Sequence, residues 1–195
     1  NTKVSRGKRI AILETTKNFA QNQPVGSPVS QAKIYESQLA DELIIINIAN
    51  SDDDRIDMFK SVVREMSYEL ATPLAVGGGI TKFEQVQELL NRGADKVILN
   101  SAAIERPKLI TDVANRYGSQ CVIVSIDARK RSNDYSVFTN CGTKDSGKEP
   151  IEWGKQSAGL GAGEIMMAHH AYEQIQGIAC GQRIGHRGVG ALVVL

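Results

Sequence analysis

Three consecutive glycines mark the place where this sequence most clearly offers a binding site. A short apolar segment, residues 73–76, runs directly into Gly77, Gly78 and Gly79, and a helical pattern starts at Thr81. Glycines lack a Cβ atom, so their backbone N–H groups can approach an anion closely. The N-terminal end of the following helix favours negative charge at the same place. The segment therefore predicts binding of a phosphate group.

A second strand end repeats this arrangement about twenty residues later. Asn100 and Ser101 follow the apolar segment 97–99 and offer further hydrogen-bond donors. Two neighbouring parallel strands with donors at their carboxyl ends make a site for a phosphate. We predict that one phosphate of a phosphorylated small-molecule substrate is bound by Gly77, Gly78, Gly79, Asn100 and Ser101. A tight turn between strand and helix is the structural alternative for the glycines.

Asp127 is the leading candidate for a catalytic residue. It ends the apolar segment 120–126, and a carboxylate in a partly dry site can have its pKa raised for proton transfer. A carboxylate that only caps the following turn is the alternative. Asn47 ends another apolar segment, where its amide can hydrogen-bond a sugar hydroxyl but cannot act as a base.

The bulk composition excludes several classes of function. A net charge of +1 gives no electrostatic reason to bind nucleic acid or an anionic membrane, and an aromatic share of 5% argues against base stacking. No apolar run is long enough to span a membrane and no signal peptide opens the chain. Three widely spaced cysteines fit reduced thiols. We therefore expect a cytoplasmic protein without nucleic-acid or membrane partners.

The histidines do not form a metal-binding pattern. His169 and His170 are adjacent, so on a strand they point to opposite faces, and His186 lies in a tail rich in arginine and glycine. No cysteine or carboxylate stands at ligand spacing to them. We predict neither a metal site nor a cofactor.

Apolar segments of strand length alternate with helical patterns along most of the chain. Such alternation predicts βα units with a parallel sheet. The repeat of about 25 to 30 residues fits a (βα)8 TIM-type barrel, with an open doubly wound sheet as the alternative. Polar residues at successive strand ends favour the barrel. The expected strands are 41–48, 74–76, 97–99, 120–127 and 163–167, the helices are 54–70, 81 onward, 107–117 and 149–160, and a small hairpin includes 135–139.

We expect a single domain over residues 1–195, with barrel-like βα units over 19–167 and an atypical tail over 168–195. Only residues 182–189 separate two faint strand patterns in that tail, whereas a parallel crossover needs about a dozen residues or more. The barrel is therefore expected to be incomplete or truncated after its sixth strand.

Residues 19–167 resemble the HisF-like cyclase subunit of imidazole glycerol phosphate synthase, in the HisA/HisF family. Each motif is weak alone, but the ordered set is specific. The motifs are Ala40-Asp41-Glu42-Leu43, Val76-Gly77-Gly78-Gly79-Ile80, Gly93-Ala94-Asp95-Lys96-Val97, Asn100-Ser101-Ala102-Ala103, Gly118-Ser119-Gln120-Cys121-Val122, Ser125-Ile126-Asp127-Ala128 and Gly161-Ala162-Gly163-Glu164-Ile165.

The resemblance implies a (βα)8 barrel that acts in histidine biosynthesis as a lyase. Such an enzyme takes a phosphoribulosyl aminoimidazole carboxamide nucleotide, adds ammonia, cleaves the substrate and closes the imidazole ring. The ammonia comes from a HisH-like glutaminase subunit, with which a heterodimer is implied. The family uses an aspartate at the position of Asp127 as general acid and base.

At the opposite end of the strands, the resemblance implies a gate for ammonia that includes Glu42, Lys96 and Glu164. Asp95 matches a position at which the glutaminase docks. These charges lie at strand starts, so a partly buried salt-bridge cluster is the equally weighted alternative.

The sequence also departs from the family pattern. The catalytic aspartate and the substrate-binding lysine of the family's first strand fall near Gly7 and on Thr15, and Asn47 stands where the family has aspartate. Two alternatives to the histidine pathway follow. One is a HisF-like partner in amidino-sugar synthesis for surface polysaccharides, which is similar around residues 142–148. The other is a catalytically inactive relative.

Overall fold

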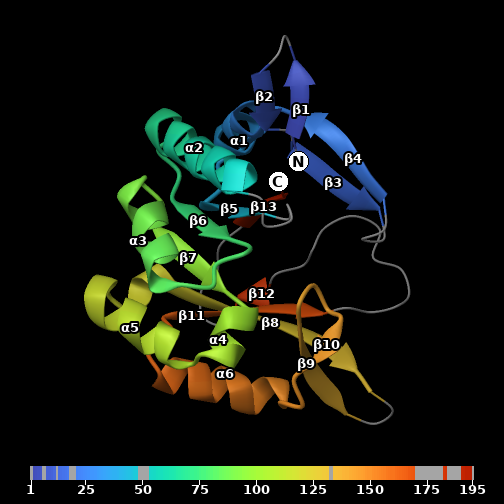
Figure 1. Cartoon of the computed structure of the whole chain (residues 1–195), viewed down its shortest axis with the longest axis vertical. Helices are drawn as coiled ribbons and strands as arrows, with labels where there is room; N and C mark the ends of the chain where they lie inside the picture. The colour runs from blue at the N-terminus through green and yellow to red at the C-terminus, as the bar shows by residue number, and fades with distance from the viewer. Residues whose placement is uncertain are drawn as a thin grey trace. The chain divides into compact units, whose positions relative to one another are not determined.

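The chain forms two compact units of alternating strands and helices (Figure 1). The first comprises Asn1–Gly79, Gln87–Asp95 and Arg187–Leu195, and the second comprises Ile80–Val86 and Lys96–His186. The computed structural model describes residues 2–5, 8–11, 13–17, 21–47, 53–131, 134–169, 182–183 and 190–194. The single-domain description of residues 1–195 stays a prediction.

Three parallel strands form the sheet of the first unit. β5 (Glu42–Ile46) pairs with β6 (Leu74–Gly77) on one edge and with β13 (Gly190–Val194) on the other. β6 is buried along its whole length, as expected for an apolar strand covered on both faces. The faint strand pattern seen in the tail of the sequence therefore corresponds to a strand beside β5.

The segment before these strands forms antiparallel pairs rather than a parallel strand. β1 (Thr2–Ser5) pairs with β2 (Lys8–Ala11), and β3 (Leu13–Lys17) pairs with β4 (Gln21–Gly26). Thr15 lies in β3, and Gly7 lies outside the described residues. The first parallel strand of the family pattern thus has no counterpart among these four strands.

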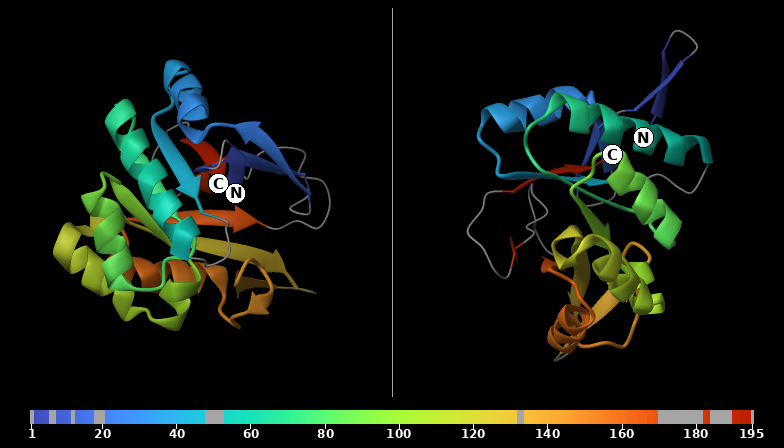
Figure 2. Two further views of the ribbon diagram at one scale, coloured as in Figure 1. Left: turned by 45° about the horizontal axis from the view of Figure 1, so that its top comes forward. Right: turned by 90° about the vertical axis from the view of Figure 1, so that its left-hand side faces the viewer.

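Two helices pack side by side in this unit (Figure 2). They are α1 (Pro28–Ser37) and α2 (Asp53–Glu69). Glu36 of α1 ties down the segment that follows α2, because its Oε1 accepts hydrogen bonds from the backbone N–H groups of Ala71 and Thr72 at 2.8 and 3.0 Å. The core-facing side of α2 follows the helical period, with buried side chains at Phe59, Val62, Val63 and Met66.

The second unit is also built on three parallel strands. β8 (Val122–Lys130) pairs with β7 (Lys96–Leu99) through residues 122–124 and with β11 (Glu164–His169) through residues 123–128. β11 also pairs with the short β12 (Gln182–Arg183). Three helices belong to this unit: α4 (Ser101–Glu105), α5 (Lys108–Tyr117) and α6 (Pro150–Gly159).

α6 packs against β8 and β11 (Figure 1). Its start is fixed by Glu149, whose carboxylate accepts from the N–H groups of Ile151 and Glu152 at 3.0 and 2.7 Å, an N-cap arrangement. Ile126 reaches this helix, since its Cδ1 lies 3.6 Å from the place of a Cβ on Gly154. Side chains alternate along a strand, so Asp127 points away from α6.

α3 (Phe83–Asn91) links the two units in sequence. Thr81 and Glu84 have the spacing of a capping box. Instead the side-chain oxygen of Gln85 accepts from the N–H groups of Thr81 and Lys82 at 2.8 and 3.0 Å. Gln85 is the third residue of the helix, and its side chain reaches back to the N–H of Lys82, the residue before the helix. This is one of the two hydrogen bonds of a capping box, shifted by one residue from Thr81 and Glu84.

β8 continues past its parallel neighbours into an antiparallel hairpin. β9 (Tyr135–Thr139) pairs with residues 127–130 of β8, and β10 (Lys144–Asp145) returns along β9. Residues 127 and 128 pair with both β9 and β11, so these two strands lie on opposite edges of β8. The expected excursion hairpin is therefore present, and β8 supplies its first strand.

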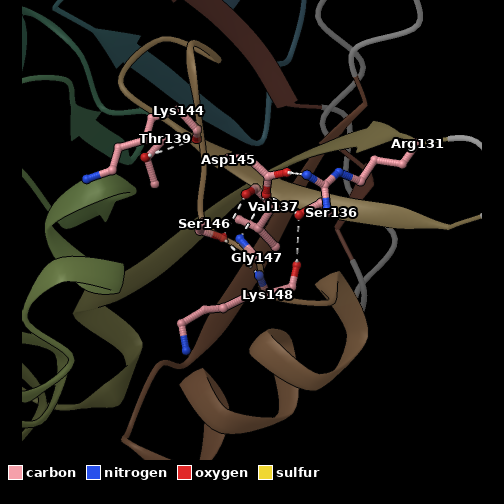
Figure 3. A network of polar contacts seen from close by, with 9 residues as sticks. All are labelled: Arg131, Ser136, Val137, Thr139, Lys144, Asp145, Ser146, Gly147 and Lys148. Atoms are coloured by element: carbon pink, nitrogen blue, oxygen red, sulfur yellow. Dashed lines mark hydrogen bonds and ion pairs between the residues drawn. The ribbon is translucent and has the colours of Figure 1, made fainter.

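Asp145 holds the hairpin together (Figure 3). Its Oδ1 accepts from the hydroxyl of Ser136 and from the N–H of Gly147, the latter at 2.8 Å, and its Oδ2 pairs with the guanidinium of Arg131. These contacts favour the ionised carboxylate. The hydroxyl of Ser136, followed by Gly147 and the charge of Arg131, lowers the pKa of Asp145 below its ordinary value of 3.8.

The folded-state pKa of Asp145 is depressed, so its stabilising effect is present at neutral pH and is lost as the pH falls through that pKa. We expect the Asp145→Asn variant to unfold at a lower temperature than the wild type at pH 7, with the gap narrowing below about pH 4. Thermal unfolding followed by circular dichroism at pH 7, 5 and 3.5 measures this. The Asp112→Asn variant, altered at a partly exposed helix residue that pairs with Lys108 at 3.9 Å, serves as control. A gap that stays constant with pH would contradict the assigned ion pairing.

Candidate active site

In the first unit, Asn47 and the glycine turn lie together at the carboxyl ends of β5 and β6. The N–H of Asn47 donates to the carbonyl of Gly77 at 2.8 Å. Gly78 passes so close to Asn47 that a Cβ at residue 78 would lie 2.1 Å from the Asn47 carbonyl oxygen. Both Gly78 and Gly79 have left-handed φ angles, +90° and +72°. The turn thus requires glycine at 78 for conformation and for space.

The exposure of the three glycines differs along the turn. Gly77 is buried within β6, Gly78 is partly exposed and Gly79 is exposed. No heavy atom of the described residues lies within 4 Å of the place where a Cβ on Gly79 would stand. The last glycine is therefore exposed, with open space on the side where a Cβ would stand.

In the second unit, Asn100 and Ser101 follow the end of β7, and Asp127 lies on the adjacent strand β8 beyond its pairing with β7. Leu99 pairs with Val124, so Asn100 follows β7 at the level of Ser125 on β8. Asp127 lies two residues further along β8 and is partly exposed. The Ser125 hydroxyl lies 3.5 Å from Asp127 Oδ1, as expected for side chains on the same face of a strand. The carboxylate is thus on a sheet face, close to the strand end.

Ser101 forms a contact that the sequence did not suggest. The backbone N–H of Asn140, in the turn of the β9–β10 hairpin, donates to Ser101 Oγ at 2.9 Å. Ser101 Oγ also lies 3.4 Å from Asn100 Oδ1. The hairpin turn therefore reaches the end of β7, and both predicted phosphate-binding residues of this unit lie beside it.

Charged side chains stand at the opposite ends of the strands. Lys96 and Glu164, at the starts of β7 and β11, form a close ion pair, and their side chains are 21% and 26% exposed. Glu42, at the start of β5 in the first unit, is buried, with 3% of its surface exposed. The ion pair between Lys96 and Glu164 agrees with the structural alternative, a partly buried salt-bridge cluster. The family resemblance implies a gate for ammonia that includes the same two residues.

Asp95 has a defined structural contact. Its Oδ2 accepts from the N–H of Leu74 at 2.8 Å, while its own N–H donates to the Leu74 carbonyl at 2.9 Å. These reciprocal bonds attach the residue to the start of β6. Asp95 is exposed. The resemblance implies that a glutaminase subunit docks at this position.

The described part of the chain holds no cluster of three or more histidine, cysteine or acidic residues suited to a metal ion. His169 ends β11, whereas His170 and His186 lie outside the described residues. Within the same described part, no helix is both long enough and apolar enough to cross a membrane.

Together these features define a class of protein: an α/β fold of parallel βα units with glycine, amide and carboxylate groups at the carboxyl ends of its strands. The chain belongs to the histidine biosynthesis protein family, whose model matches residues 4–172. This match confirms the predicted barrel-type fold class and the HisF-like resemblance.

A relative in Prochlorococcus marinus (strain MIT 9313) supports the same placement. It is named "Putative imidazole glycerol phosphate synthase subunit hisF2" and is 48% identical over 157 residues. The matched region covers 80% of this chain and 60% of the relative. The chain thus corresponds to somewhat less than two thirds of the length of that protein.

The glycine turn yields a paired prediction. In Gly78→Ala, the new Cβ meets backbone of Asn47 in a left-handed conformation, and we expect a loss of at least about 2 kcal/mol in unfolding free energy. In the matched control, Gly79→Ala, only the left-handed strain remains, about 1 kcal/mol. Urea unfolding of both variants measures the difference. Equal losses would show that the approach to Asn47 is relaxed in solution.

Proposed function

We propose that this chain provides a cyclase-type activity of the imidazole glycerol phosphate synthase kind, acting on a phosphoribulosyl aminoimidazole carboxamide nucleotide in histidine biosynthesis. The observation that carries the proposal is the placement of Asp127. The carboxylate lies on β8, three residues past the last residue paired with β7, on the face turned away from α6, and Asn100 and Ser101 follow the end of β7. Enzymes built from βα units place their catalytic groups at these strand ends.

Asp127 would act as the general acid and base of the reaction. Cleavage of a C–N bond and closure of a ring each require a proton to be moved. The carboxylate is half-buried between β9 and β11, where it pairs in register with Phe138 and Ala168. The amide of Asn47 cannot act as a base, so we assign the proton transfer to Asp127.

Donors for a substrate phosphate would come from the strand ends that the sequence predicted. The backbone of Gly79, which is exposed, and the side-chain amide of Asn47 would supply them in the first unit. Asn100 and Ser101 supply side-chain groups in the second. Backbone N–H groups and hydroxyls together suit a phosphate, because each can donate a hydrogen bond to a charged oxygen.

The ammonia would come from a glutaminase subunit bound as a heterodimer at the opposite ends of the strands. Glu42 and the ion pair of Lys96 with Glu164 would belong to the gate, and Asp95 would lie at the docking surface. Support for this part comes from the resemblance in sequence and from the relative's name.

The Asp127→Asn variant tests the proposed role. Its amide keeps the size of the side chain but cannot accept and return a proton, so we expect ammonia-dependent turnover to fall by about 10²- to 10⁴-fold. Turnover is measured as formation of the imidazole product from the nucleotide with excess ammonium. The Asp134→Asn variant, altered at an exposed hairpin residue, is the control and should keep wild-type turnover.

Three outcomes discriminate between the functions considered. Turnover of the histidine-pathway nucleotide by the wild type, lost in Asp127→Asn, supports the proposal. Turnover only of an amidated sugar substrate would assign the chain to surface-polysaccharide synthesis. Binding without turnover of either substrate would identify a catalytically inactive relative.

A further inference from the structure

Arg129 lies on the same face of the sheet as Asp127. The two residues are separated by one position on β8, and both continue the face that begins with Ser125. Ala128, between them, is buried, on the face to which Ile126 and α6 belong. β8 therefore presents the carboxylate of Asp127 and then the guanidinium of Arg129 on one face of the sheet.

The guanidinium of Arg129 is held on two sides. Its central carbon stands 5.0 Å from the centre of the Phe138 ring, a cation–π distance, and Phe138 is the residue that pairs with Asp127 in the β8–β9 register. Its Nη2 lies against the hairpin turn, 2.6 Å from the place of a Cβ on Gly142. A glycine at residue 142 thus makes room for the arginine.

The turn that contacts Arg129 has an unusual backbone. Asn140, Cys141 and Gly142 all adopt left-handed φ angles, of +51°, +54° and +75°. Asparagine and glycine tolerate this region, but a cysteine there carries a steric cost of roughly 1–2 kcal/mol. The same turn donates the hydrogen bond from Asn140 to Ser101. One strained turn therefore fixes Arg129 and Ser101 together.

We propose that Arg129 is a further substrate-binding residue, which binds a phosphate oxygen of the substrate beside Asp127 and thereby selects anionic substrates. This inference rests on the proposed function, because it concerns the substrate of that same site. The guanidinium stays charged at any physiological pH. Stacking uses its flat face, and hydrogen bonds to an anion use the N–H groups at its edge, so it can make both kinds of contact at once.

A neighbouring arginine stabilises the hairpin. Arg131 follows two residues later and pairs with Asp145 within the hairpin (Figure 3). Its charge is matched inside the hairpin network that includes Ser136 and Gly147. Arg131 is therefore a suitable control for any effect that arises only from loss of positive charge or from loosening of the hairpin.

The test measures binding of the phosphoribulosyl aminoimidazole carboxamide nucleotide by calorimetry in the absence of ammonia, with sulfate as an anionic competitor. We expect Arg129→Met to weaken binding about tenfold or more, because a charge-assisted hydrogen bond is lost. Arg129→Lys should restore part of the affinity, and Arg131→Met should bind like the wild type. Sulfate should compete less well with the nucleotide in Arg129→Met.

The outcomes separate this inference from the proposed reaction. Wild-type affinity in Arg129→Met would overturn the inference even if the enzyme turns over. An equal loss of affinity in Arg129→Met and Arg131→Met, with equal falls in melting temperature, would also overturn it and assign Arg129 to hairpin structure. If the chain binds the nucleotide through Arg129 but does not turn it over, the inference is supported and the proposed reaction is wrong. No binding by the wild type would overturn the inference.

Discussion

The alternation of side chains along paired parallel strands is the constraint on which the candidate site depends. Because β7, β8 and β11 are held in a fixed register, each side chain of β8 must face either α6 or the opposite side. Apolar Ile126 and Ala128 take the helix side, where they are buried. Asp127 and Arg129 are thereby directed to the opposite face. A slip of one residue would exchange the two sets of side chains between the faces.

The two ends of these strands carry different kinds of polar group. Beyond their paired carboxyl-terminal parts stand partly exposed polar groups, such as Asp127 and Ser101. At the starts stand charges that satisfy one another, as Lys96 does with Glu164. Such a partly buried ion pair adds little net stability by itself. This separation is consistent with a substrate at one end and an ammonia route at the other, as the proposed function requires.

The sequence predicted the strands and helices whose patterns are long or buried, and it missed elements that depend on distant contacts. β5, β6 and β8 are apolar runs and were found. α1 was missed because it buries only Pro28 and Ala32, so it has no apolar stripe. α4 was missed because it has only five residues. The role of Asp127 stays a prediction from a polar residue that follows an apolar run, whereas the contact of Asn140 with Ser101 joins residues 39 positions apart and left no local pattern.

The overhang of β8 beyond its parallel neighbours has a consequence for how this protein family can diversify. The hairpin is closed by its own polar contacts around Asp145, and its strands pair with the overhang rather than with β7 or β11. Insertions or exchanges in this segment would leave the register of the parallel strands intact. Different hairpins could therefore be grafted onto β8 while Asp127 and the parallel strands stay unchanged.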